Sequence, residues 1–145
     1  MAKGMADKSD AKALRQLCCV EYRLEGCEIL DKYSDDQLAA IFNGIGPDFF
    51  PDSITSLLDA LHPSLLPVAL VHDVEFKESD GSVPSFEAAN DRFLRNGCKV
   101  AKLKFGWYNP RRYAVMFDAW RYSKTCDLFG WYAWCAACNR GGSAS

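Results

Sequence analysis

The stretch Leu70-Val71-His72-Asp73-Val74-Glu75-Phe76 gives the clearest indication of the fold of this 145-residue chain. It sets a histidine beside a carboxylate in an otherwise apolar run. Pro67 stands just before it, and proline suits the first turn of a helix, where its missing N–H would have no intrahelical partner. We therefore expect a helix from Val68 to about Lys77. Successive helical residues point about 100° apart, so the side chains of His72 and Asp73 diverge and would do different jobs.

Apolar residues recur at helical spacing on both sides of this stretch. Ser34 and Gln37 form a capping box that opens one helix, and Ser85 can cap another. Gly130 is the weak point of the final periodic stretch, which is one long helix or two stacked ones. No run alternates as a strand does, so the chain is expected to be all-α, with room for a small hairpin at residues 79–84. The other expected helices cover residues 9–26, a short piece from Asp52 or Ser53 to Leu61, residues 85–98 and the segment after Pro110.

Length and composition indicate one soluble domain. The chain is 49% hydrophobic, which is enough for a core, and we place the domain at residues 9–140 with tails at 1–8 and 141–145. A net charge of −2 predicts no nucleic-acid partner. Neither a secretory signal nor a membrane-spanning run is visible, so a cytoplasmic location is expected, with a virion-associated or released form as an alternative. Seven cysteines, an odd number, favour buried thiols over a disulfide framework.

Three segments could together form a site. An imidazole can act as a base near neutral pH, and a carboxylate is a hard oxygen ligand for Mg²⁺ or Ca²⁺. The glycine-containing segment 43–46 could aim several carbonyl oxygens at one point, as calcium cages often require. Asn90 or Asp91, near an apolar helical stripe, could accept a hydrogen bond from His72 and fix its tautomer.

This ordered set resembles the phospholipase A2 family, and most closely the small phospholipase-like proteins of bacteria and their phages. The resemblance covers roughly residues 38–98 and rests on Asn43-Gly44-Ile45-Gly46, on His72-Asp73 with Phe76, and on Ala89-Asn90-Asp91-Arg92-Phe93-Leu94. It implies two long packed helices and a glycine-rich calcium loop. It also implies that His72 is the general base, that Asp73 binds Ca²⁺, and that the segment Asn43, Gly44, Ile45 and Gly46 supplies further metal ligands.

The chain differs from the secreted members of that family at their cysteine positions and at the residue that orients the histidine. Val68 and Ala69 stand where those enzymes have cysteines, and Glu75-Phe76 stands where they have Cys-Tyr. The orienting residue is Asp91 when the chain is aligned on the Asp-Arg pair of the secreted enzymes. It is Asn90 when the chain is aligned on the pattern of the bacterial proteins.

The expected function is calcium-dependent hydrolysis of phospholipid acyl esters at a membrane or other aggregated lipid surface. The alternative is a non-catalytic phage or mobile-element protein that keeps the helical scaffold for protein–protein association. His62 is expected at the surface or at a cap, and Cys135 and Cys138 in core packing.

Two further segments admit more than one interpretation. The basic segment 99–104 with Arg111-Arg112, Trp107 and Tyr108 suits an anionic lipid or RNA, although an ordinary solvated face is favoured. Core packing is the default for the aromatic segment 129–134, and a membrane interface or a partner surface is the alternative.

Overall fold

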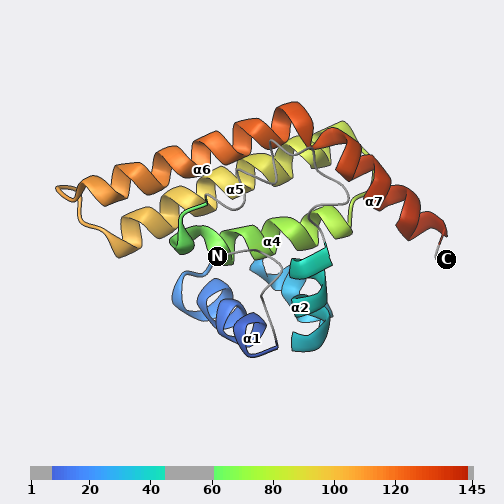
Figure 1. Cartoon of the computed structure of the whole chain (residues 1–145), viewed down its shortest axis with the longest axis horizontal. Coiled ribbons are helices and arrows are strands. Elements are labelled where there is room, and N and C mark those ends of the chain that lie inside the picture. The colour runs from blue at the N-terminus through green and yellow to red at the C-terminus, as the bar shows by residue number, and fades with distance from the viewer. Residues whose placement is uncertain (1–7, 45–60, 144–145) are drawn as a thin grey trace.

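The computed structural model describes residues 8–44 and 61–143, and every regular element within these ranges is helical (Figure 1). This confirms the all-α prediction. The α-helices are α1 (Lys8–Gln16), α2 (Asp35–Gly44), α4 (Leu66–Lys77), α5 (Val83–Lys104), α6 (Pro110–Phe129) and α7 (Trp131–Ser143). Three short turns complete them: a π-turn η2 (Leu17–Glu21) and the 3-10 turns η3 (Cys27–Lys32) and η4 (Pro63–Leu65). The short helix expected at residues 52–61 lies almost wholly outside the described residues.

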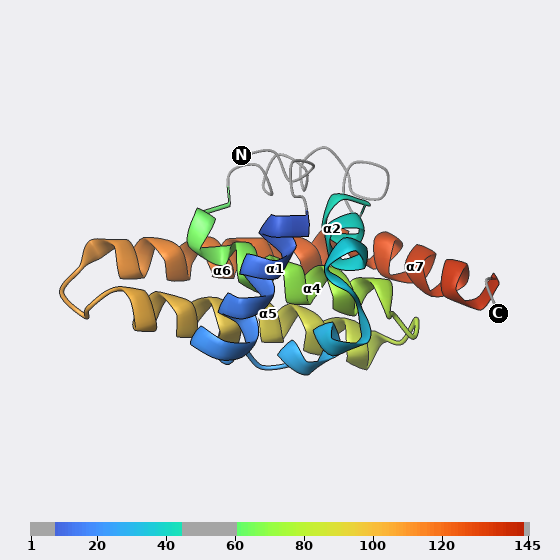
Figure 2. The same cartoon turned by 90° about the horizontal axis from the view of Figure 1, so that it is seen from below.

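Helix α4 runs through the middle of the molecule. The antiparallel α5–α6 hairpin and α7 pack on one side of it, and α1, α2 and η3 pack on the other (Figures 1 and 2). Because α4 has neighbours on both sides, residues 67–76 are all buried. The turn between α5 and α6 projects beyond the other described elements at the left of both views.

Several predicted helix boundaries are confirmed by their hydrogen bonds. Ser34 N–H donates to Gln37 Oε1 (2.8 Å) and Gln37 N–H donates to Ser34 Oγ (3.2 Å), so the predicted capping box opens α2. Asn109 caps α6, because Arg111 N–H donates to its Oδ1 (3.0 Å), and Pro110 occupies the first turn. His62 caps η4 through Nδ1, which accepts from Ser64 N–H (3.1 Å).

The cap of α5 is Ser82 rather than Ser85. Ser82 Oγ accepts from Ser85 N–H at 3.3 Å, and the helix starts at Val83. The hairpin allowed for at residues 79–84 is absent from this described segment. Asp80 organises a turn there instead, because its Oδ1 accepts from the Ser82 N–H (2.9 Å) and hydroxyl (2.8 Å).

The first predicted helix is shorter than its periodicity suggested. Regular α-helix stops at Gln16, one π-turn follows to Glu21, and the chain then reverses through Arg23 (φ +48°) and Gly26 (φ +84°). Gly26 does mark a break, but it precedes the new turn η3. The apolar spacing of residues 14–27 therefore spans three short elements.

The final stretch forms two helices that meet at Gly130, one of the two predicted arrangements. Helix α7 continues to Ser143, past the domain boundary expected at residue 140. The aromatic segment 129–134 is only partly core, because Trp134 is 3% exposed whereas Tyr132 is 72% exposed. None of the seven cysteines, which all lie in the described ranges, forms a disulfide, and Cys18 and Cys126 are the fully buried ones.

In the described part of the chain, no helix combines the length and the apolar character needed to cross a bilayer.

Candidate functional site

His72 lies at the centre of α4 and contacts Asn90 of α5. Its Nε2 is 2.8 Å from Asn90 Oδ1, and both side chains are buried. The two residues come together because α4 and α5 are packed helices joined by the short turn at residues 78–82. Of the two candidates for orienting the histidine, the structure therefore places Asn90 against the imidazole. Asp91 is exposed on α5 and lines a pocket.

The direction of this hydrogen bond follows from the next residue in the network. Asn90 Nδ2 donates to Asp127 Oδ1 of α6 at 2.9 Å, so the amide oxygen must face His72. An amide oxygen only accepts, and His72 Nε2 is therefore the donor. A neutral His72 then carries its proton on Nε2 and keeps Nδ1 as its basic nitrogen. This is the tautomer that a general base at Nδ1 requires.

Asp127 is a member of the network that sequence reasoning missed. It is half-buried, accepts from Asn90 and pairs with Lys124 Nζ at 3.5 Å. Together with Phe86, Glu87 and Asp91 it lines a pocket of about 280 Å³. The network thus runs from the buried imidazole to an acidic pocket at the surface.

Three aromatic rings surround the imidazole. The ring of Phe76 lies 4.6 Å from it between centroids, that of Phe93 5.3 Å and that of Tyr122 5.8 Å. Tyr122 is completely buried, and this burial raises the pKa of its hydroxyl well above the usual value, with the Cys126 thiol and the Asp73 carboxylate adding to the rise. His72 is consequently 2% exposed in an apolar, aromatic surrounding.

The expected metal ligands are only partly described. Asp73 is 1% exposed and lies close enough to Tyr122 to affect its hydroxyl. Asn43 and Gly44 form the last turn of α2, which packs against α4, rather than the start of a loop. Ile45 and Gly46 lie outside the described residues.

Among the expected metal ligands, the described side chain with a hard oxygen donor of the kind calcium prefers is that of Asp73. Within the described ranges, no group of three histidine, cysteine, aspartate or glutamate side chains could hold a metal ion. The donor chemistry at Asp73 therefore fits calcium, and the remaining ligands would have to come from main-chain oxygens of the kind expected at residues 43–46.

Glu75 is a second buried acid, and it was not predicted from the sequence as a site residue. It is 9% exposed and forms an ion pair with Arg92 of α5, whose Nε is also 3.5 Å from Glu25 Oε1. Burial raises the pKa of the Glu75 carboxyl to about 7, although the attraction of Arg92 opposes the rise. A glutamate in the middle of an apolar helix indicates a buried acid. The spacing of residues along the helix does not show which side chain neutralises it.

Comparison with protein-family models, with curated proteins and with solved structures gave no match for this chain.

Proposed function

We propose that this protein is a phospholipase A2-like hydrolase that cleaves acyl esters of phospholipids in the presence of calcium, with His72 as the general base. The observation that carries the proposal is the hydrogen bond between His72 Nε2 and Asn90 Oδ1. It holds the imidazole in the tautomer whose Nδ1 can take a proton from water. The same residues carry the sequence resemblance to that family.

In this mechanism, Nδ1 of His72 removes a proton from the attacking water as the water oxygen adds to the ester carbonyl. The imidazolium then returns the proton to the alcohol oxygen that leaves. Asn90 keeps the ring oriented through both steps, and its amide stabilises the imidazolium less than a carboxylate would. Asp127 supports Asn90 by accepting from its Nδ2. Calcium held by Asp73 would supply an electrophile for the carbonyl oxygen.

The burial of His72 and Asp73 favours a second candidate function, a non-catalytic scaffold that binds another protein. His72 and Asp73 are 2% and 1% exposed, and aromatic rings surround the imidazole. Buried polar side chains of a purely structural core are likewise hydrogen-bonded. On this alternative, the His72–Asn90–Asp127 network fixes the packing of α4, α5 and α6 in a non-catalytic scaffold that binds another protein.

Release of fatty acid from phospholipid vesicles separates the two functions. The protein is assayed with millimolar calcium and with EDTA, beside His72→Gln, which keeps a hydrogen-bond donor for Asn90. His62→Gln is the matched control, because it changes the other histidine of the chain. If the protein is a hydrolase, fatty-acid release should require calcium. His72→Gln should lower the rate of release by roughly 10²–10⁴-fold, and His62→Gln should leave it nearly unchanged. No release by the unmodified protein, or equal release by His72→Gln in a folded state, would refute it.

A further inference from the structure

Large apolar side chains are exposed along the first three turns of α6 and at the adjoining α5–α6 turn. Tyr113, Phe117 and Trp120 follow one another at i, i+4 and i+7, so they form a single stripe along α6. Their exposed fractions are 53%, 60% and 48%. Three further apolar side chains are exposed in the last helical turn of α5 and in the turn that follows it: Leu103, Trp107 and Tyr108. We call these six residues the hairpin surface.

The hairpin surface is held in place by local contacts. The rings of Phe117 and Trp120 stack with their centroids 5.9 Å apart, and Tyr113 Oη donates to the Trp107 carbonyl oxygen at 2.6 Å. The opposite face of α6 is occupied by packing against α5 and is fully buried at Val115 and Ala119. The stripe therefore cannot turn inward without unpacking the two longest helices. Single exposed apolar residues are ordinary, but a contiguous stripe marks an interaction site.

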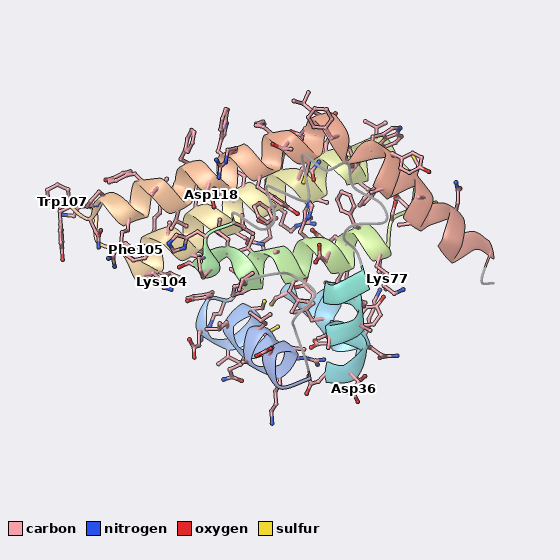
Figure 3. All side chains as sticks on the ribbon, in the orientation of Figure 1. Asp36, Lys77, Lys104, Phe105, Trp107 and Asp118 are labelled. Atoms are coloured by element: carbon pink, nitrogen blue, oxygen red, sulfur yellow. The ribbon has the colours of Figure 1, made fainter. Side chains whose placement is uncertain are left out.

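Positive charge is concentrated around the same surface. Residues 98–121 contain six lysines and arginines and one acidic residue, a net charge of +5. Since the whole chain has a net charge of −2, the rest carries −7. The single acid, Asp118, is 8% exposed and is already engaged by Arg121 and by the main-chain N–H of His62 (2.7 Å). Figure 3 shows Asp118 set back from Trp107, Phe105 and Lys104 at the hairpin end.

We propose that the hairpin surface docks onto an anionic phospholipid bilayer. Tyrosine and tryptophan rings favour the level of the headgroups, and lysines and arginines are attracted to anionic lipids. The charge separation would orient the molecule with its basic end against the membrane and its acidic remainder away from it. Because the α5–α6 turn projects in both views, it can reach a flat surface before the rest of the described molecule (Figures 1 and 2).

The choice of lipid over another anionic partner rests on the proposed hydrolysis of phospholipid, which requires contact with a lipid aggregate. Proteins that stack aromatic rings on single-stranded nucleic acid usually do so in a groove that follows the backbone. The hairpin surface instead lies on the outer side of α6 and on the projecting turn. A bilayer is therefore the occupant that suits both the shape and the chemistry.

The test is co-sedimentation with vesicles in EDTA, so that docking is measured without hydrolysis. Phosphatidylcholine vesicles with and without phosphatidylserine are compared at low and physiological salt. Lys102→Glu/Arg111→Glu is compared with Lys12→Glu/Lys77→Glu, because all four side chains are exposed and both pairs change the net charge equally. Phe117→Ala/Trp120→Ala is compared with Tyr132→Ala, an exposed aromatic near the other end of α6.

If the hairpin surface docks onto anionic lipid, binding of the protein to vesicles should require phosphatidylserine and should weaken as the salt concentration rises. Each basic residue at such a surface contributes about fivefold to affinity, so the hairpin charge reversal should weaken binding at least about 25-fold. The aromatic variant should lose on the order of tenfold, and both controls should bind nearly as the unmodified protein does. Equal loss in the hairpin and control variants would overturn the proposal, as would absence of binding to the anionic vesicles. So would equally tight binding of a single-stranded oligonucleotide that displaces the vesicles.

The outcomes for docking and for hydrolysis are separable. Vesicle binding that the hairpin variants weaken, without fatty-acid release in calcium, would support docking and refute the hydrolase. Binding by His72→Gln equal to that of the unmodified protein is also expected, because His72 is buried in the core and distant in sequence from the hairpin turn.

Discussion

Gly97 of α5 faces Ala119 of α6 so closely that a Cβ atom on Gly97 would lie 2.5 Å from the Ala119 Cβ. The same hypothetical atom would lie 3.3 Å from Leu65 Cδ2. A methyl group at this position is therefore accommodated only if the two helices separate. This close approach requires a small residue at position 119 of α6, so a large aromatic side chain could not occupy this point of contact.

Gly97→Ala should lower the free energy of unfolding by about 1–3 kcal/mol through overpacking, despite the better helix propensity of alanine. Chemical denaturation monitored by circular dichroism measures the change. Ala119→Gly should relieve this overpacking, since it removes the methyl group that the new Cβ would meet. The double variant should be more stable than the sum of the single effects predicts. Simple additivity would mean that the two helices are not in tight contact here.

A charge-conserving exchange tests the role of Asn90. In Asn90→Asp/Asp127→Asn, the new carboxylate at position 90 accepts a hydrogen bond from His72. The new amide at position 127 donates a hydrogen bond to that carboxylate, so the three side chains remain connected. A carboxylate favours the charged imidazole more than an amide does. If His72 is the base, the acidic limb of the pH–rate profile for fatty-acid release should move to higher pH by about one unit.

Asp127→Asn alone is the control for that exchange, because it removes the outer charge and leaves Asn90 against the imidazole. Its pH–rate profile should move much less than that of the double variant. Identical profiles for the unmodified protein and the double variant would contradict a catalytic role for the network.

Much of the local structure could be predicted because it depends on neighbouring residues. The capping box of Ser34 and Gln37, the break at Asn109-Pro110 and the helix after Pro67 all follow from short-range hydrogen bonds and backbone restrictions. The meeting of His72 with the segment at residues 90–91 was also anticipated, but the sequence left Asn90 and Asp91 open.

The long-range relationships could not be predicted in the same way. Asp127 lies 37 residues from Asn90, and no local pattern connects the two. Helix α6 carries apolar residues at helical spacing on two faces, one with Val115 and Ala119 and one with Phe117 and Trp120. Periodicity alone does not say which face is buried, and here the face that contains Ala119 is the one in close contact with Gly97 of α5.

Glu75 should make stability fall as pH rises through the weakly acidic range. Burial raises the pKa of its carboxyl to about 7 in the folded protein, so the folded state holds this proton where the unfolded state has lost it. Its stabilising contribution is complete below about pH 4 and is lost as pH approaches 7, by about 3 kcal/mol at most. The difference in unfolding free energy between the unmodified protein and Glu75→Gln, measured at several pH values, isolates this group. A difference that is constant from pH 4 to pH 8 would contradict the prediction.

Gly26→Ala should affect both the backbone of the turn before η3 and the ion pair between Glu75 and Arg92. Gly26 has φ +84°, a conformation that costs an alanine about 1–2 kcal/mol. A Cβ there would also lie 3.0 Å from Arg92 Cδ and 3.5 Å from Glu75 Oε1, so the guanidinium must move from the carboxylate it neutralises. The variant should therefore be less stable at every pH, and its stability should fall more steeply toward pH 7 than that of the unmodified protein. Gly26→Ala/Glu75→Gln should keep the constant backbone loss and lose the steeper slope, whereas a slope that persists without Glu75 would assign the pH dependence to another group.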